Sequence, residues 1–208
     1  MTKYLITPSL INSYFYYIND EWKSPADSRA DFLKTLSREK FEPNEAMQKG
    51  IDFENQIMNC CKDKPFQCHE IMEFYDGKDP VMEIAMIVEG GFWQQVVKKN
   101  ITIGNQEFIL YGKCDVIERD TIFDIKYTSN YEVGKFSDSI QHLIYLYCSD
   151  LPKFSYLVSN GKEWWREDYV NNDNIESDIK SKITDFVNYL DNDQEAKELF
   201  FSKWQSKY

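Results

Sequence analysis

The sequence predicts an α/β (α+β) fold in which a central mixed β-sheet is flanked by helices. Three observations lead to this prediction. The 208 residues, 42% of them hydrophobic and 16% aromatic, suffice for one domain with a substantial core. Helical patterns occupy both ends of the chain, and strand patterns separated by turn residues occupy its middle. We therefore expect a single domain over residues 1–208, with N-terminal helices over 7–62, a catalytic core over about 81–170 and C-terminal helices over 174–206.

Three helices are expected before the sheet. Thr7 followed by Pro8 is typical of an N-cap and of the first helical position. Pro43 is expected to begin the third helix. The three segments run from residue 8 to about 17, from 27 to 39, and from 43 to about 61 or 62.

The middle of the chain alternates between apolar segments and turn residues. A helix that begins at Ser137 or Asp138 is expected to end near Ser149. Gly104-Asn105 and Asn160-Gly161 are typical turns between strands, and a further tight turn is expected near residues 119–121. The expected strands cover residues 81–88, 92–103, 107–118, 121–127, 153–159 and 164–170. Two C-terminal helices follow, over 174–190 and to about 203.

Two carboxylates and a lysine are expected to meet on one face of this sheet. Asp124 and Lys126 are two residues apart and share a face, while Ile125 points to the opposite, apolar side. Asp115 on the preceding strand comes across from Asp124. Alone, an Asp-x-Lys pattern is more often a pair of solvated charges, but the segment 121–127 is apolar enough for a covered strand, where a charge needs a partner or a metal. Carboxylate oxygens suit Mg²⁺ or Mn²⁺, and a metal beside a lysine suits phosphodiester hydrolysis.

A glutamate interrupts the apolar stripe of the third helix. Positions spaced alternately four and three residues apart lie on one helix face. Glu54 is the charged member of this stripe, so it is either a surface residue at the stripe's edge or a carboxylate aimed at a metal. The stripe consists of Met47, Ile51, Glu54, Met58 and Cys61.

The helix that ends near Ser149 carries two polar side chains on one face. Gln141 and Tyr145 are four residues apart within an otherwise apolar segment. A buried glutamine needs hydrogen-bond partners. Gln141 therefore either faces a polar site or lies at the solvent edge of an ordinary amphipathic helix.

Taken together, these residues resemble the PD-(D/E)XK nuclease superfamily, and within it the RecB-type and phage-exonuclease branch. The opening segment, Ile6-Thr-Pro-Ser-Leu-Ile-Asn-Ser-Tyr, is similar to the first helix of that branch. The ordered set spans residues 6–145. Its motifs are Gly50-Ile-Asp-Phe-Glu54, Gly112-Lys-Cys-Asp115, Asp124-Ile-Lys126 and Gln141-His-Leu-Ile-Tyr145.

The resemblance implies a restriction-endonuclease-like core with a divalent-metal site. Asp115, Asp124 and the backbone carbonyl of Ile125 would bind Mg²⁺ or Mn²⁺. Glu54 would complete the site or hold a metal-bound water. Lys126 would orient the attacking water or stabilise the developing negative charge. Many RecB-type relatives carry histidine at the position of Glu54, so the resemblance favours the exonuclease-like variant.

The resemblance also implies roles for three polar residues around that centre. Gln141 and Tyr145 would face the site, and Gln141 would contact the DNA backbone or a metal-bound water. Thr128 would contact a phosphate.

The net charge of −11 argues against a nucleic-acid enzyme, because phosphate binding normally requires a basic surface. Binding to DNA would then need a local basic groove and bound divalent ions. The basic residues available for such a groove are Lys34, Arg38, Lys40, Lys62, Lys64, Lys98 and Lys99.

The five cysteines predict reduced thiols rather than disulfides. Cys60, Cys61, Cys68 and His69 match no established zinc pattern. Some relatives hold an iron–sulfur cluster with one early and three late cysteines; residues 1–59 and 149–208 contain none, so we expect no such cluster. No apolar run approaches a membrane span, and the N-terminus lacks a signal-peptide core, which predicts no membrane association and a cytoplasmic protein of a bacterial or phage-infected cell.

The resemblance implies a metal-dependent DNA exonuclease of phage or mobile-element type, acting in recombination, repair or replication. It also implies homo-oligomeric rings and a single-strand annealing or recombination protein as partner. An endonuclease or an RNA-directed enzyme shares the same core. The alternatives are a non-catalytic nucleic-acid- or protein-binding module on this fold, which has no chemical need for all four motif residues, and an unrelated acidic scaffold.

Overall fold

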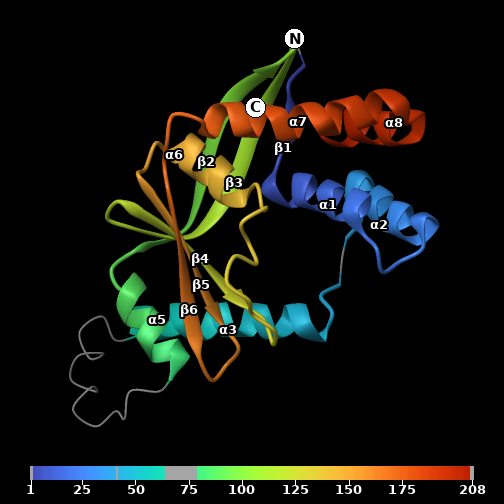
Figure 1. The fold of residues 1–208 in the computed structure, drawn as a ribbon. Coiled ribbons are helices and arrows are strands. Elements are labelled where there is room, and N and C mark those ends of the chain that lie inside the picture. The colour runs from blue at the N-terminus through green and yellow to red at the C-terminus, as the bar shows by residue number, and fades with distance from the viewer. Residues whose placement is uncertain (1, 41, 64–78, 207–208) are drawn as a thin grey trace, which may run out of the picture.

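The computed structural model describes residues 2–40, 42–63 and 79–206, and it confirms an α+β fold built on a mixed sheet (Figure 1). Within these residues, six strands form one sheet in the order β1-β3-β4-β5-β6, and β2 pairs with β3 outside this path. The strands are β1 (Tyr4–Ile6), β2 (Phe92–Ile103), β3 (Gln106–Glu118), β4 (Thr121–Tyr127), β5 (Lys153–Ser159) and β6 (Trp164–Val170). The helices are α1 (Pro8–Asn19), α2 (Pro25–Ser37), α3 (Glu45–Asp63), α5 (Pro80–Val88), α6 (Gln141–Ser149), α7 (Ile175–Asn192) and α8 (Gln194–Lys203).

The sheet combines antiparallel hairpins with two parallel pairs. β2–β3, β3–β4 and β5–β6 are antiparallel, and the predicted turns separate them. β1 runs parallel to β3, and β4 runs parallel to β5. Because parallel neighbours need a crossover connection, the chain passes through α6 between β4 and β5. This crossover brings α6 over the strand that carries the predicted carboxylate and lysine.

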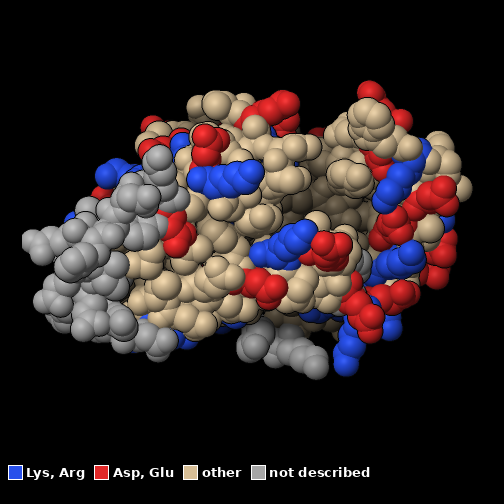
Figure 2. Space-filling view, turned by 90° about the horizontal axis from the view of Figure 1, so that it is seen from below, with Lys and Arg blue, Asp and Glu red and all other residues tan. Residues whose placement is uncertain are grey.

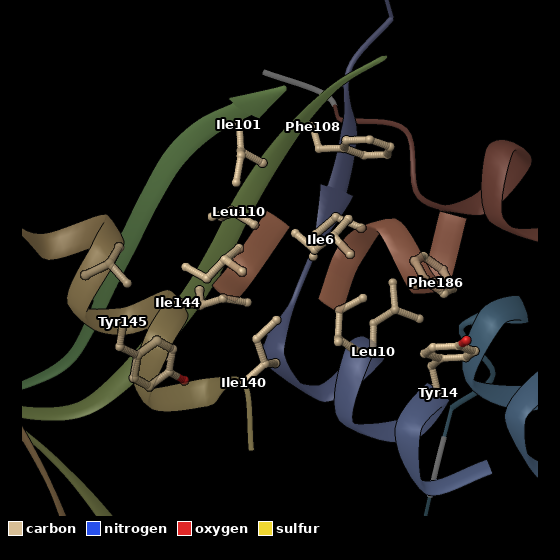
Figure 3. Close-up of a cluster of buried hydrophobic side chains, with 14 of the residues drawn as sticks. Ile6, Leu10, Tyr14, Ile101, Phe108, Leu110, Ile140, Ile144, Tyr145 and Phe186 are labelled. Atoms are coloured by element: carbon tan, nitrogen blue, oxygen red, sulfur yellow. The ribbon is translucent and has the colours of Figure 1, made fainter. Parts of the chain in front are cut away.

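Helices cover the two faces of the sheet and enclose two apolar cores. The larger core combines side chains of α1, α2, α6, α7 and α8 with those of β1, β2, β3, β4 and β5, and Figure 3 labels ten of them. The smaller core lies beneath α3 and α5. Figure 1 shows α3 and α5 on the side of the sheet away from α7 and α8.

The N-terminal helices begin where polar side chains cap them. Thr7 accepts a hydrogen bond from the N–H of Leu10, as its sequence position predicts. α2 begins at Pro25 rather than at residue 27 because Ser24 caps it, and it ends where Arg38 adopts a left-handed conformation. The third helix begins at Glu45, two residues after the predicted start at Pro43.

The prediction of a strand over residues 81–88 is wrong, because this segment is helix α5. Asp79 caps the helix by accepting a hydrogen bond from the N–H of Val81, and Pro80 occupies the first turn. A short apolar run does not distinguish a buried strand from a buried helix. The cap and the proline decide in favour of a helix.

The predicted cap of α6 at Ser137 or Asp138 is also wrong. The helix begins at Gln141, and Ile140 precedes it without a side-chain cap of its own. Instead the N–H of Ile140 donates to Oδ1 of Asn12, a residue of α1. Oγ of Ser139 also accepts from the N–H of Gln141 and from Nδ2 of Asn12, so the start of α6 is held by a local serine together with a contact to a distant segment.

Residues near the two ends of the chain form a common edge of the sheet. β1 was not predicted, because three residues are too few for a periodic pattern. The N–H of Leu5 donates to the carbonyl of Trp204, and the N–H of Ser206 donates to the carbonyl of Lys3, each at 2.8 Å. Tyr4 forms an antiparallel bridge with Gln205. β1 thus lies between β3 and residues 204–206.

Candidate functional site

The hairpin of β3 and β4 brings two carboxylates together as the sequence predicts. The antiparallel register pairs Val116 with Phe123, so the next position along the strands places Asp115 beside Asp124. Oδ2 of Asp115 accepts a hydrogen bond of 2.9 Å from the N–H of Ile125. The side chain of Ile125 belongs to the smaller core, on the face opposite the carboxylates.

Asp124 is the central residue of the site. Its side chain is 2% exposed, and its Oδ2 lies 2.6 Å from Nζ of Lys126. This contact is an ion pair rather than a well-aligned hydrogen bond. On its other side, Nε2 of Gln141 donates to Oδ1 of Asp124 at 2.5 Å. The aspartate, the lysine and the glutamine therefore form one contiguous polar group.

Tyr145 joins this group from the next turn of α6. Nε2 of Gln141 lies 3.3 Å from Oη of Tyr145, which in turn donates to the carbonyl of Lys113 at 2.9 Å. The tyrosine ring lies directly over Gly112 of β3. A Cβ atom at position 112 would approach the ring to 2.2 Å, so only glycine fits there. Gly112 thus has a packing role that its place in a sequence motif does not explain.

Glu54 lies at the edge of the site, on α3. The apolar stripe of α3 looks buried from its pattern, but two of its positions are not: Met47 and Ile51 are exposed, and the buried residues of α3 are Phe53 and Ile57. The reason is geometric, since the N-terminal half of α3 extends beyond the strands (Figure 1). Glu54 itself is half-buried and accepts a hydrogen bond of 2.6 Å from Gln94.

The site carries more negative than positive charge. Burial and then the neighbouring Asp124 carboxylate raise the pKa of Glu54, and the same two causes raise the pKa of Asp115 well above its usual value. Burial acts to lower the pKa of Lys126, but attraction to Asp124 and Asp115 outweighs it, so the pKa of the ammonium is raised. Three carboxyl groups thus share one ammonium, and a bound cation would relieve their repulsion.

The donor chemistry of the site fits a hard divalent cation. Carboxylates and a backbone carbonyl are the ligands that Mg²⁺ and Mn²⁺ prefer. In residues 2–40, 42–63 and 79–206, no three His, Cys, Asp or Glu side chains converge as a ready-made metal cluster. The N–H of Ile125 engages one oxygen of Asp115, and the ammonium of Lys126 engages one oxygen of Asp124. Asp115, Asp124 and Glu54, with the Ile125 carbonyl, remain the residues that would hold the metal.

Thr128 lies apart from these carboxylates. It follows β4, where its hydroxyl donates to the carbonyl of Asn130 and accepts from Nζ of Lys135. These contacts hold a surface loop together. The predicted phosphate contact of Thr128 therefore stays a prediction.

The basic residues proposed for a nucleic-acid groove divide between two regions. Lys98 and Lys99 line one hollow together with Lys3. Lys34, Arg38 and Lys40 line a groove of about 840 Å³ that α1 and α2 border. In the view from below, basic and acidic side chains are interleaved, and the surface is hollowed near its centre (Figure 2). Lys62 is exposed at the end of α3, and Lys64 lies outside the described residues.

A separate hollow of about 460 Å³ lies at the site itself. Lys113, Lys126, Gln141 and Tyr145 line it on one side, and the first turn of α1 lines it on the other. Ser9 of α1 borders both this hollow and the larger groove. Lys113 belongs to the motif around Asp115 but was not predicted as a residue of the site, since a lone lysine on a strand is normally a solvated charge.

The cysteine group at the end of α3 is only partly described. Cys60 and Cys61 are half-buried, and Cys61 contacts the carbonyl of Ala85. Cys68 and His69 lie outside the described residues. The predicted absence of a zinc site and of an iron–sulfur cluster is therefore left as a prediction.

Comparison with known proteins supports the fold. No protein-family model matches the chain, and no curated protein matches it. A solved structure described as "Crystal structure of SSO0001" aligns with 89% of this chain and 76% of that chain, with a TM-score of 0.56 and 11% sequence identity. At this identity the likeness shows the fold alone. In the described residues, no helix is long and apolar enough to cross a membrane.

Proposed function

We propose that this protein is a divalent-metal-dependent nuclease of the PD-(D/E)XK type that hydrolyses phosphodiester bonds in DNA. The observation that carries the proposal is the contiguous group of Asp115, Asp124 and Lys126 on one sheet face, with Gln141 at 2.5 Å from the central aspartate. Residues of four sequence motifs, from separate segments of the chain, meet at this point. An accidental set of surface charges would not bring them together.

The residues of the site have different chemical roles. Bound Mg²⁺ or Mn²⁺ would supply Lewis acidity and a water of lowered pKa. Lys126 keeps its proton, because its pKa is raised, and therefore stabilises negative charge on the phosphate instead of acting as a base. Gln141 fixes the orientation of Asp124, and Tyr145 holds Gln141.

The groove beside α1 supports a nucleic-acid substrate despite the net charge of −11. Four basic residues and two acidic residues line it, and both Lys23 and Lys34 contact the same Asp31 at 2.9 Å. Arg38 lies with its guanidinium 4.7 Å from the ring centre of Trp204. An excess of cations along a groove is what a phosphate backbone requires.

An exonuclease acting in recombination, repair or replication is the form of this proposal that we favour. Assembly into a homo-oligomer, pairing with a single-strand annealing or recombination protein, and a cytoplasmic location belong to the same proposal and depend on the sequence resemblance.

The first test uses end-labelled linear duplex, closed circular duplex and single-stranded DNA with Mg²⁺ or Mn²⁺. We expect loss of linear DNA that disappears without the metal and in Asp124→Ala. Cleavage of closed circles would make the enzyme an endonuclease. A parallel RNA substrate tests the choice of nucleic acid.

One observation favours a second candidate, a non-catalytic binding module on the same fold. Ile125 and Lys126 already engage Asp115 and Asp124, and the described carboxylates form no ready-made metal cluster. Calorimetry with Mn²⁺ and an isosteric Asp115→Asn control distinguishes the two. Metal binding that depends on Asp115, together with turnover, supports the nuclease; DNA binding without either supports the module.

A further inference from the structure

The ribbon of β2 and β3 bends at one position, opposite the first carboxylate of the site. The antiparallel register places Gln94 of β2 opposite Asp115 of β3. Gln94 has a φ of 56°, which is a left-handed conformation rare for any residue other than glycine, and rarer still inside a strand. A backbone held in this way costs of order 1–3 kcal/mol and persists only where surrounding contacts impose it.

The same bend is evident from which of the two cores each strand residue packs in. Along a regular strand, residues two or four apart point to the same face. Cys114 nevertheless packs in the larger core and Val116 in the smaller one. On the partner strand, Val97 packs in the larger core and Trp93 in the smaller one. In both strands the side chains therefore switch from one face of the sheet to the other, at Gln94 in β2 and at Asp115 in β3.

The bend directs the side chain of Gln94 to Glu54. Its Nε2 donates to Oε1 of Glu54 at 2.6 Å, across 40 residues of sequence, and both side chains are half-buried. Oε2 of Glu54 is not used by this hydrogen bond. A neutral amide donor holds the carboxylate without cancelling its charge, whereas a lysine or arginine at position 94 would compete with a cation for it.

We propose that Gln94 is a positioning residue that holds Glu54 toward the carboxylate pair, so that one Glu54 oxygen is presented to a divalent cation. This inference rests on the proposed function for the presence of the cation. The inference goes beyond the proposed function by adding Gln94 to the site. This residue belongs to β2, which carries none of the sequence motifs. The left-handed backbone conformation at Gln94 makes this positioning possible, because it turns the side-chain amide toward α3.

Mn²⁺ affinity of the intact protein without DNA tests the proposal independently of turnover. Gln94→Gly removes the amide but retains the bend, because glycine adopts a positive φ without strain. We expect Mn²⁺ affinity to fall about 10-fold or more, the usual effect of losing a partner that orients a metal ligand. Gln94→Asn keeps an amide and a residue type that tolerates this conformation but shortens its reach, so it should also bind Mn²⁺ more weakly.

Two controls separate positioning from a change in backbone. Arg119→Gly changes another non-glycine residue of positive φ, in the exposed turn after β3, and should leave Mn²⁺ affinity unchanged. In a Glu54→Gln background, Gln94→Gly should have no further effect, since the two residues act as a unit. A cooperative thermal unfolding transition in each variant establishes that it is folded.

The outcomes are distinct. Weaker Mn²⁺ binding in Gln94→Gly that vanishes in the Glu54→Gln background supports the proposal. Unchanged affinity in both Gln94 variants overturns it while leaving the metal-dependent function intact. If the wild-type protein itself fails to bind Mn²⁺, the proposed function falls, and the role of Gln94 falls with it.

Discussion

Replacing Gly112 by alanine tests the contact on which the geometry of α6 depends. The added Cβ would lie 2.2 Å from Cε1 and 2.8 Å from Cδ1 of Tyr145. The ring must therefore retreat by about 1.2 Å to reach an ordinary contact of 3.4 Å. Tyr145 is only 4% exposed, and it is bonded to Lys113 and Gln141. Its burial and these two hydrogen bonds oppose such a movement, although one side of the residue borders the hollow at the site.

The expected cost combines two effects. Overpacking of a filled core costs about 1–3 kcal/mol. Loss of the tyrosine hydrogen bond to the Lys113 carbonyl adds about 1 kcal/mol. A total of about 2–4 kcal/mol should lower the Tm, since a domain of this size loses roughly 2–4 °C for each kcal/mol. Cleavage should also fall, because displacement of Tyr145 releases Gln141 from Asp124.

The matched control is Gly50→Ala, in another of the sequence motifs. Gly50 lies within α3, where an added Cβ meets nothing within 4 Å. Alanine is favoured over glycine inside a helix by about 1 kcal/mol, so this variant should be more stable than the wild type. Urea denaturation and calorimetry measure both changes. Equal stability of Gly112→Ala and wild type would refute the packing argument, whatever the activity.

Three further predictions concern the site, a buried histidine and the groove. Asp124→Ala and Lys126→Ala should abolish cleavage while circular dichroism remains that of the folded protein, because both residues serve charge rather than packing. Burial lowers the pKa of His142 to about 4. On acidification the histidine therefore takes up a proton at higher pH in the unfolded chain than in the folded one. The free energy of unfolding should fall as the pH drops from about 6.5 to about 4, by about 3 kcal/mol in all. Arg38→Ala combined with Lys40→Ala should weaken DNA binding, and the loss should shrink as salt is added.

Each of these predictions has a control. Residual turnover in either site variant would show that the cluster is not the catalytic centre. His142→Gln should flatten the pH dependence of stability; an unchanged slope would assign it to other groups. Lys3→Ala combined with Lys98→Ala removes the same charge from the other hollow. If it weakens DNA binding equally, net charge rather than the groove determines affinity.

The sequence predicted those parts of the site that depend on strand periodicity. Asp124 and Lys126 share a face because they are two residues apart, and Asp115 meets Asp124 because the turn at residues 119–120 fixes the register. Gln141 and Tyr145 contact each other because four residues separate them in a helix. These relations are local, so a pattern along the chain suffices to show them.

The parts that the sequence did not predict depend on distant segments. The hydrogen bond between Gln94 and Glu54 requires a bend that becomes visible only when the facing strand is known. The N–H of Ile140 at the start of α6 donates to Asn12 of α1, 128 residues away. The stripe of α3 was misjudged at Met47 and Ile51, because helical periodicity identifies a face but not how far the sheet extends beneath it.

The shared edge formed by β1 and residues 204–206 has a consequence for the order of events during synthesis. The carbonyl of Trp204 that accepts the N–H of Leu5 is made 199 residues after Leu5. At a synthesis rate of about 5–20 residues per second, this interval is about 10–40 s. Until then one edge of β1 lacks these partners, and an unpaired edge invites pairing with another chain. A chain released before Trp204 would therefore contain every proposed site residue and still expose an unpaired strand edge.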